Sequence, residues 1–306
     1  MLQPKKLFPG ARIALIGTSG PLPEGRLEPT LEALRALELE PVVFESAISR
    51  HGYLSGTDDL RVRDLNAAFQ DDSIQGVLCI RGGYGAHRLM SGIDFDMIRC
   101  HPKLFGGYSD VTALNIAFNE LCDMMTYHII MPSTEYYKPV DEYSMDYLKR
   151  ALFGTLAGPV ENPADRPPME TITPGKARGR LCGGNLSLVQ QSVGTPWAID
   201  TKDKILFLED IGEKPYRVDA MLTQLKNSGK LSDCAGIVLG YWTDCQAEDP
   251  AKSLSLDTIF DEIIKPLGIP AVKGLCCGHD LPTCALPLGA MVSLDADACT
   301  LVIEEG

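Results

Sequence analysis

The first half of the chain alternates short apolar runs with segments of helical periodicity. A continuous apolar run at 11–17 is typical of a strand buried on both faces of a parallel sheet, and the segment 74–83 predicts a strand that runs into glycines. Leucines at helical spacing predict a helix over 26–38, and Thr57 is expected to cap a second helix over 57–70. The other elements predicted here are strands at 41–46, 103–110 and 124–130 and a helix at 110–122.

This alternation of strands and helices predicts an α/β domain over residues 1–153, with a doubly wound, flavodoxin- or Rossmann-like parallel sheet. The composition then changes, because residues 154–180 contain five prolines and four glycines, and we expect a linker there. A second, mixed α/β domain is predicted over 181–306. Its expected elements are strands at 204–210, 234–240 and 269–274, a helix at 218–229 and a terminal β-hairpin.

Composition excludes several classes of function. The 306 residues carry a net charge of -13, with 41 acidic and 28 basic side chains, so we expect no nucleic-acid partner. No apolar run is long enough to span a membrane, and the N-terminal segment lacks the pattern of a secretory signal. Many of the ten cysteines lie in apolar runs, as small buried side chains do. We therefore expect a cytoplasmic protein without disulfide bonds or membrane partner.

Two segments raise the question of a metal or cofactor. Cys276, Cys277, His279 and Cys284 are close in sequence, but their spacing matches no standard zinc pattern. The loop 17–20 follows a predicted strand as a dinucleotide-binding loop would, yet it lacks the G-x-G-x-x-G pattern. We therefore expect neither a metal ion nor an organic cofactor.

A serine stands at the sharpest predicted turn of the first domain. Gly106 and Gly107 precede Tyr108 and Ser109, between an apolar strand and a helix. The following helix would direct its N–H groups toward the turn, as at a nucleophile elbow, although the G-x-S-x-G pattern is absent. A simpler interpretation is that Ser109 or Asp110 caps the helix. The local sequence does not decide between the two.

Other candidates also lie at predicted strand ends, where ligands bind in parallel sheets. The loop 81–85 offers Arg81, for a carboxylate, and turned backbone amides for an oxyanion. Glu209, at the end of a predicted strand, is suited to orient a histidine, or it is simply solvated. His128 and His279 are the candidate general bases, and spacing alone does not choose between them.

Taken together, the segments resemble the LD-carboxypeptidase family of serine peptidases, which includes muramoyl-tetrapeptide carboxypeptidases and microcin C immunity peptidases. The resemblance covers nearly the whole chain and rests on blocks in a fixed order. The most informative blocks are RIALIGTSGP, IRGGYGAHRLM, GGYSDVTALN, GRLCGGNLSLV, FLEDIGEKPYRVDAMLTQL and GHDLPTCALPLG.

The resemblance implies a Ser-His-Glu triad at the interface of the two domains. By position in the motifs, the nucleophile is Ser109, the acid is Glu209 and the base is His279, which is thereby preferred to His128. The oxyanion hole is expected from the backbone amides of Asp110 and Gly83, with Gly82 not excluded.

The resemblance also implies cleavage between an L-centre, meso-diaminopimelate or lysine, and a terminal D-alanine of murein tetrapeptide, in peptidoglycan recycling. Arg81, or else Arg217, is expected to bind the terminal carboxylate, while Asn185 and Trp197 are candidates to line the substrate side. A homodimer is expected from the family. In one departure, the sequence at 128–132 is HIIMP where the family commonly has His-Gly-Pro-Met, and this leaves the substrate open.

Two alternatives differ in function. One is an immunity-type amidase acting on a peptide–nucleotide conjugate, for which an aromatic partner such as Trp242 would have to stack on a purine. The other is a non-catalytic, two-domain ligand-binding protein, which would not need an intact triad.

Overall fold

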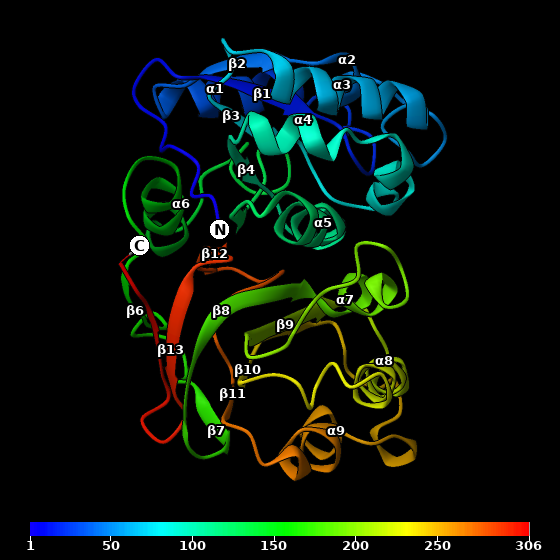
Figure 1. The fold of residues 1–306 in the computed structure, drawn as a ribbon, viewed down its shortest axis with the longest axis vertical. Coiled ribbons are helices and arrows are strands. Elements are labelled where there is room, and N and C mark those ends of the chain that lie inside the picture. Colours follow the sequence, from blue (N-terminus) through cyan, green and yellow to red (C-terminus); the bar gives the residue numbers. More distant parts are fainter. Residues whose placement is uncertain (306) are drawn as a thin grey trace. The chain divides into compact units, whose positions relative to one another are not determined.

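The computed structural model describes residues 1–305, which form two compact units. Unit 1 comprises Met1–Leu156 together with Ala285–Pro287, and unit 2 comprises the rest of the described chain from Ala157 onward. Both units are mixed α/β structures, as predicted (Figure 1). The contiguous second domain predicted from the sequence is interrupted, because residues 285–287 return to unit 1.

Unit 1 contains a six-stranded sheet in the order β12-β5-β4-β3-β1-β2. The neighbours from β2 to β5 are all parallel, which confirms the doubly wound prediction. The strands are β1 Arg12–Ile16, β2 Glu40–Val43, β3 Gly76–Cys79, β4 Leu104–Gly106, β5 Thr126–His128 and β12 Leu286–Leu288. The helices are α1 Leu27–Ala36, α2 Glu45–Ile48, α3 Asp58–Gln70, α4 Phe95–Cys100, α5 Thr112–Cys122 and α6 Glu142–Phe153, with short 3₁₀ turns at Ala86–Gly92 and Ser109–Val111.

The apolar runs of unit 1 form buried strands, as expected. Residues 13–16 of β1 and 77–79 of β3 are fully or almost fully buried, because helices connect the parallel strands and cover the sheet. Helix α3 begins where predicted, since the Thr57 hydroxyl accepts a hydrogen bond from the Leu60 amide at 3.3 Å. Such a cap stabilises a helix by about 1 kcal/mol.

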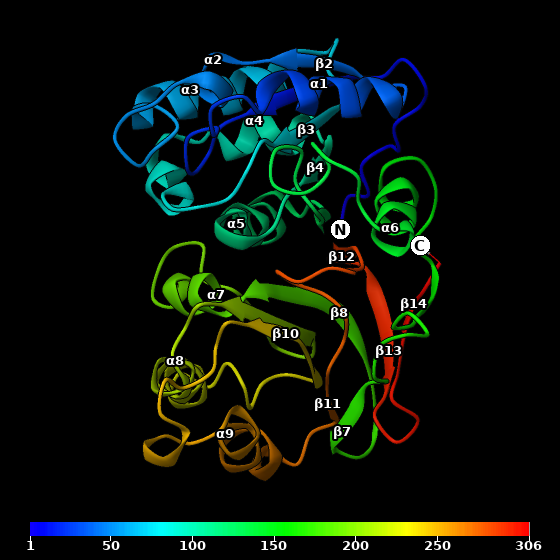
Figure 2. The same cartoon turned by 180° about the vertical axis from the view of Figure 1, so that it is seen from behind.

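Unit 2 contains an eight-stranded sheet in the order β6-β14-β13-β8-β9-β10-β11-β7. Strands β8 to β11 are parallel, whereas β13 and β14 form the predicted terminal hairpin beside β8 (Figure 2). The strands are β6 Gly158–Val160, β7 Glu170–Thr173, β8 Lys176–Asn185, β9 Ile205–Ile211, β10 Gly236–Thr243, β11 Ala271–Lys273, β13 Met291–Asp295 and β14 Thr300–Ile303. The helices are α7 Leu186–Ser192, α8 Pro215–Asn227 and α9 Leu256–Ile263, with 3₁₀ turns at Pro250–Lys252 and Lys265–Leu267.

The linker predicted over 154–180 is wrong. Strands β6 and β7 and the first half of β8 lie in this segment and belong to the sheet of unit 2. Strand β6 pairs with β14 and β7 pairs with β11, both antiparallel and both far away in sequence. Prolines are tolerated because they lie between strands or on the edge strand β6.

Candidate active site

Ser109 occupies a strained turn of unit 1. It follows β4 and opens the 3₁₀ turn that leads into α5, and its φ of 63° lies in the left-handed region that non-glycine residues rarely adopt. The turn is fixed from both sides, since Gly107 donates to the Tyr127 carbonyl at 3.0 Å and accepts from the Asn115 amide group at 3.0 Å. Strain of this kind concentrates at functional sites, where it presents a side chain for reaction.

The loop 81–85 lies against this serine. A side chain on Gly82 would place its Cβ only 3.0 Å from Ser109 Cβ and 3.1 Å from Ser109 Oγ, so the close approach requires glycine. The Gly82 carbonyl accepts from the Gly20 amide at 3.1 Å. Because C=O and N–H point in opposite directions across a trans peptide, the Gly83 amide is directed away from Gly20.

Asp110 joins the serine turn to the end of that loop. Its buried carboxylate accepts a hydrogen bond from the Ala86 amide at 2.8 Å. A second buried carboxylate, on Glu135, accepts from the Tyr108 hydroxyl at 2.8 Å and from the Met131 amide at 2.6 Å. No sequence motif pointed to Glu135, which lies in an irregular segment after β5.

The HIIMP segment does not present its isoleucines to this turn. Ile129 packs against the backbone of β4, where a Cβ on Gly106 would lie 2.5 Å from the Ile129 side chain. Ile129 and Ile130 are both buried, whereas the end of the Met131 side chain approaches Gly82. Met131, which corresponds to the family's methionine, is thus the residue of this segment whose side chain approaches the loop 81–85.

Glu209 and His279 form a hydrogen-bonded pair within unit 2. Glu209 lies fully buried near the end of β9, and its carboxylate accepts from His279 Nδ1 at 2.6 Å. His279 comes from the loop after β11, 70 positions away in sequence. A carboxylate in this position fixes the orientation of the imidazole and stabilises its protonated form.

The histidine loop is held in place by its own neighbours. Gly278 has a φ of 138°, and a Cβ there would lie 2.8 Å from Glu209 Oε2, so only glycine permits the close approach. The Gly278 amide donates to the Thr283 hydroxyl at 3.1 Å. From β10, the Tyr241 hydroxyl donates to the Pro282 carbonyl at 3.0 Å and Thr243 donates to Asp280 at 2.9 Å. These contacts restrict the loop on both sides of His279.

Asp210, next to Glu209, organises the end of β8. It accepts from Asn185 Nδ2 at 2.9 Å and from both the amide and the hydroxyl of Ser187 at 2.9 Å. Burial raises the pKa of Asp210, and the charge of Glu209 raises it further, while its hydrogen bonds oppose the shift. Asn185, a candidate for substrate contact, also caps α7 through the Leu188 amide. Its amide group is thus committed to the protein's own backbone and side chains.

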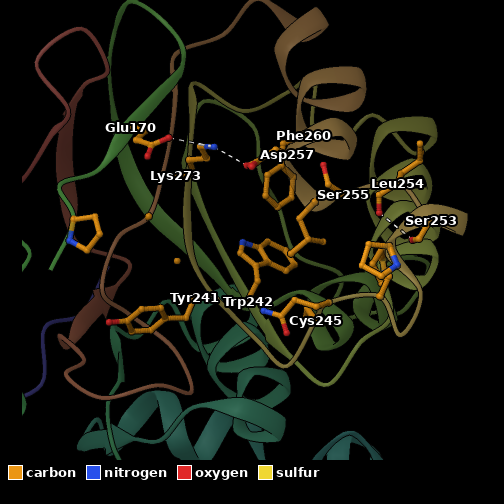
Figure 3. A pocket seen from close by; sticks show the side chains of 18 of the residues that line it. Glu170, Tyr241, Trp242, Cys245, Ser253, Leu254, Ser255, Asp257, Phe260 and Lys273 are labelled. Atoms are coloured by element: carbon orange, nitrogen blue, oxygen red, sulfur yellow. Dashed lines mark hydrogen bonds and ion pairs between the residues drawn. The ribbon is translucent and has the colours of Figure 1, made fainter.

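A cavity of about 640 Å³ opens in unit 2 beside β10 (Figure 3). Trp242 and Phe260, with ring centroids 5.2 Å apart, form an aromatic wall. Lys273, on the rim, bridges Asp257 at 2.6 Å and Glu170 at 3.2 Å, as the dashed lines show. Tyr241 belongs both to this lining and to the neighbourhood of Gly278. The volume is in the range that accommodates a small molecule.

The remaining candidates lie elsewhere. His128 is buried in unit 1 and packs against the Tyr108 ring at 5.4 Å. Arg217, on α8, is exposed and lies 3.6 Å from Glu213, and Trp197 is half-buried in the loop after α7. Cys276, Cys277 and Cys284 are buried, and no group of three or more His, Cys, Asp or Glu in the described chain is arranged to hold a metal ion.

Two family models match this chain, one in each half. Residues 13–129 match the LD-carboxypeptidase N-terminal domain, and residues 178–294 match the LD-carboxypeptidase C-terminal domain. The chain belongs to the LD-carboxypeptidase family. It is therefore a peptidase of the carboxypeptidase type, which confirms the resemblance seen in the sequence motifs.

Individual members of the LD-carboxypeptidase family support this assignment. A probable murein peptide carboxypeptidase from Bacillus subtilis (strain 168) is 40% identical over 306 residues, covering 99% of this chain and 95% of the relative. The crystal structure of muramoyltetrapeptide carboxypeptidase from Oxalobacter formigenes is similar with a TM-score of 0.85 and 28% identity, covering 96% of this chain and 99% of that one.

The family fold is also shared with a microcin C7 self immunity protein in complex with aspartyl sulfamoyl adenosine. That structure has a TM-score of 0.91 and 22% identity, with 100% of this chain and 99% of the other covered. At this identity the likeness concerns the fold.

Proposed function

We propose that this LD-carboxypeptidase is a serine hydrolase in which Ser109, His279 and Glu209 act as one triad. The observation that carries the proposal is the hydrogen bond of 2.6 Å between His279 Nδ1 and the buried Glu209 carboxylate. The Glu209–His279 pair provides the base and its orienting acid in unit 2. The strained φ of Ser109 provides a presented hydroxyl in unit 1. The proposal is that the two half-sites work on the same substrate.

The reaction follows from these groups. With Nδ1 held by Glu209, we assign proton transfer to His279 Nε2. His279 takes the proton of Ser109 as Oγ attacks the carbonyl carbon of the scissile amide, and a tetrahedral oxyanion forms. The C–N bond then breaks, and His279 gives the proton to the departing amine. A water molecule, activated by His279, hydrolyses the resulting ester and regenerates the Ser109 hydroxyl.

Backbone amides of Gly83 and Asp110 are proposed as the oxyanion hole. The Gly83 amide points away from Gly20, because the preceding carbonyl is fixed there. Asp110 directly follows the nucleophile, and its side chain is anchored to the Ala86 amide. One such donor contributes about 3–4 kcal/mol to transition-state stabilisation in other hydrolases.

The proposed substrate is murein tetrapeptide, cleaved between the L-centre of its third residue and terminal D-alanine. The names of the relatives from Bacillus subtilis and Oxalobacter formigenes support this substrate class. A role in peptidoglycan recycling, a cytoplasmic location and a homodimer remain predictions. No helix among the described residues has the length and apolar character needed to cross a bilayer.

An amidase acting on an aminoacyl sulfamoyl nucleoside is the second candidate. It rests on the microcin C7 self immunity protein, whose complex contains aspartyl sulfamoyl adenosine. The alternative needs a site for a nucleoside, and the aromatic wall of Trp242 and Phe260 is the surface of unit 2 that would suit one. A non-catalytic binding protein is not favoured, since the Glu209–His279 pair is intact.

The deciding experiment incubates the protein with murein tetrapeptide and, separately, with aspartyl sulfamoyl adenosine. Release of D-alanine, followed by mass spectrometry, is expected for the wild type and not for Ser109→Ala. Equal release by both proteins would refute the role of Ser109. Cleavage of the nucleoside conjugate alone would move the assignment to the second candidate. Ser73→Ala, an exposed serine at a distant turn, is the matched control.

A further inference from the structure

The carboxyl ends of β1 and β3 form the point of unit 1 where a ligand is expected. In the sheet order β2-β1-β3-β4-β5, successive connections leave β1 and β3 in opposite directions along the sheet. Ligands of doubly wound proteins bind in the crevice at such a switch point. Two loops meet here, since the Gly20 amide from the β1 end donates to the Gly82 carbonyl from the β3 end at 3.1 Å.

Arg81 bridges these two loops. Its Nη1 donates to the Pro21 carbonyl at 3.1 Å and its Nε to the Gly82 carbonyl at 3.1 Å. Both acceptors are neutral carbonyls, and a guanidinium has five N–H donors, so donors remain for a ligand. The side chain is half-buried, which strengthens any charged hydrogen bond it forms.

Arg81 belongs to a group of arginines without carboxylate partners. Burial lowers the pKa of Arg81, and the charges of Arg26 and Arg50 lower it further. Arg26 lies at the same strand end, because it donates to the Ser133 carbonyl at 2.9 Å and Ser133 Oγ donates to the Ile80 carbonyl at 2.9 Å. Among the described residues, none of the three arginines forms an ion pair with Asp or Glu.

Arginines without carboxylate partners are unexpected in so acidic a protein. The chain carries a net charge of -13, and in the same unit Arg61, Arg63 and Arg88 all pair with aspartate or glutamate. The charges of Arg26 and Arg50 both act unfavourably on Arg81, and a bound anion would offset this repulsion. Arginine suits a carboxylate in particular, because its planar fork binds both oxygens.

We propose that Arg81, supported by the charges of Arg26 and Arg50, binds the free α-carboxylate of the C-terminal residue that leaves. The inference rests on the proposed function. Gly82, next to Arg81, lies against the Ser109 hydroxyl. A terminal carboxylate lies one residue, about 3–4 Å, beyond the attacked carbonyl. The arginine group thereby restricts cleavage to the last peptide bond.

The test compares murein tetrapeptide with the same peptide ending in D-alaninamide. Binding to Ser109→Ala protein is measured by calorimetry, and turnover by the wild type is measured in parallel. We expect Ser109→Ala to bind the acid about 10- to 100-fold more tightly than the amide, the range of one hydrogen bond to a charged group. Adding Arg81→Gln should reduce this ratio to near one, and Arg81→Lys should restore part of it.

Two further variants keep the inference testable if Arg81→Gln does not fold. Arg50→Gln changes an exposed side chain and should lower the ratio by a smaller factor in the same direction. Arg63→Gln, whose arginine is paired with Glu45 and Asp64, should leave it unchanged. The inference is overturned if Ser109→Ala binds the acid and the amide equally well. It is also overturned if the preference for the acid is unchanged when Arg81→Gln is added. Inorganic phosphate displacing the acid peptide far better than acetate would assign the group to phosphate and also overturn it.

Turnover separates this inference from the proposed function. If the wild type releases D-alanine but binding shows no preference for the acid, the function stands and the carboxylate site fails. If the wild type cleaves neither peptide while the preference for the acid depends on Arg81, the carboxylate site stands and the proposed reaction fails.

Discussion

The carboxylate of Asp110 accepts the backbone N–H of Ala86 at 2.8 Å and so joins the serine turn of unit 1 to the glycine loop beside it. Both residues are buried, so water cannot replace this hydrogen bond. One side chain therefore fixes the relative position of the Ser109 turn and the loop 81–85, which the proposed oxyanion hole and carboxylate site both require.

Removing this carboxylate should affect stability and catalysis together. In Asp110→Ala the buried Ala86 amide loses its acceptor, at an expected cost of about 1–3 kcal/mol in the free energy of unfolding. Turnover should also fall because the loop 81–85 loses its anchor. Asp110→Asn keeps an acceptor oxygen and should recover most of both losses. Urea unfolding measures the loss of stability and steady-state kinetics the loss of turnover. Equal losses in Asp110→Ala and Asp110→Asn would contradict the role of Asp110 as the acceptor for the Ala86 amide.

Neutralising Glu209 should reduce catalysis without unfolding unit 2. Glu209→Gln keeps the shape of the side chain, but an amide no longer stabilises a protonated imidazole. We expect kcat to fall by about 10⁴-fold with little change in KM, as in other triads. Glu248→Gln, in an exposed pair with Lys214, serves as the control and should retain full activity. A loss of less than about tenfold in Glu209→Gln would argue against a triad.

Crowding the Glu209–His279 pair should also lower turnover. In Gly278→Ala the new Cβ would meet Glu209 Oε2 at 2.8 Å and displace the histidine loop. Misplacement by about 1 Å can cost about 10²-fold in rate. Gly274→Ala is the matched control, since its φ of 84° also lies in the left-handed region, while the new Cβ would be 3.8 Å from the Pro168 carbonyl oxygen. Gly278→Ala should lower kcat far more than Gly274→Ala, and equal kcat values would contradict the crowding effect.

Lys6 should make stability depend on alkaline pH. Burial lowers the pKa of Lys6 from 10.5 to about 8, and its ammonium donates to the Tyr127 hydroxyl and the Ala151 carbonyl. Between these pKa values the unfolded chain binds more protons at Lys6 than the folded protein, so stability rises with pH.

The unfolding free energy of the wild type minus that of Lys6→Met should therefore rise as the pH rises from about 8 toward 10.5, because only the wild type gains stability in this window. It should be constant below this window. Denaturant titrations at several pH values measure it, and a flat difference across the window would show that Lys6 keeps its ordinary pKa when folded.

Local patterns in the sequence predicted most of unit 1. The apolar runs that became β1 and β3 and the Thr57 cap of α3 depend on neighbouring residues alone, and each was found where expected. The strand predicted over 41–46 was too long, because the helix α2 begins at Glu45. The segment 154–180 was misjudged because proline and glycine content indicates irregular backbone but says nothing about partner strands.

The sequence by itself determined most strands and helices of unit 1, which chemical groups stand at the strand ends, and the family motifs that contain Ser109, Glu209 and His279. Periodicity, capping and turn formation are local, so a linear pattern records them. Only the tertiary structure decided that His279 has a carboxylate partner while His128 packs against Tyr108. It also decided that β6 and β7 join a sheet, and that Arg26 and Arg81 gather at one strand end without a counter-charge. These relationships join residues far apart along the chain, and hydrogen bonding, burial and charge act through distance in space.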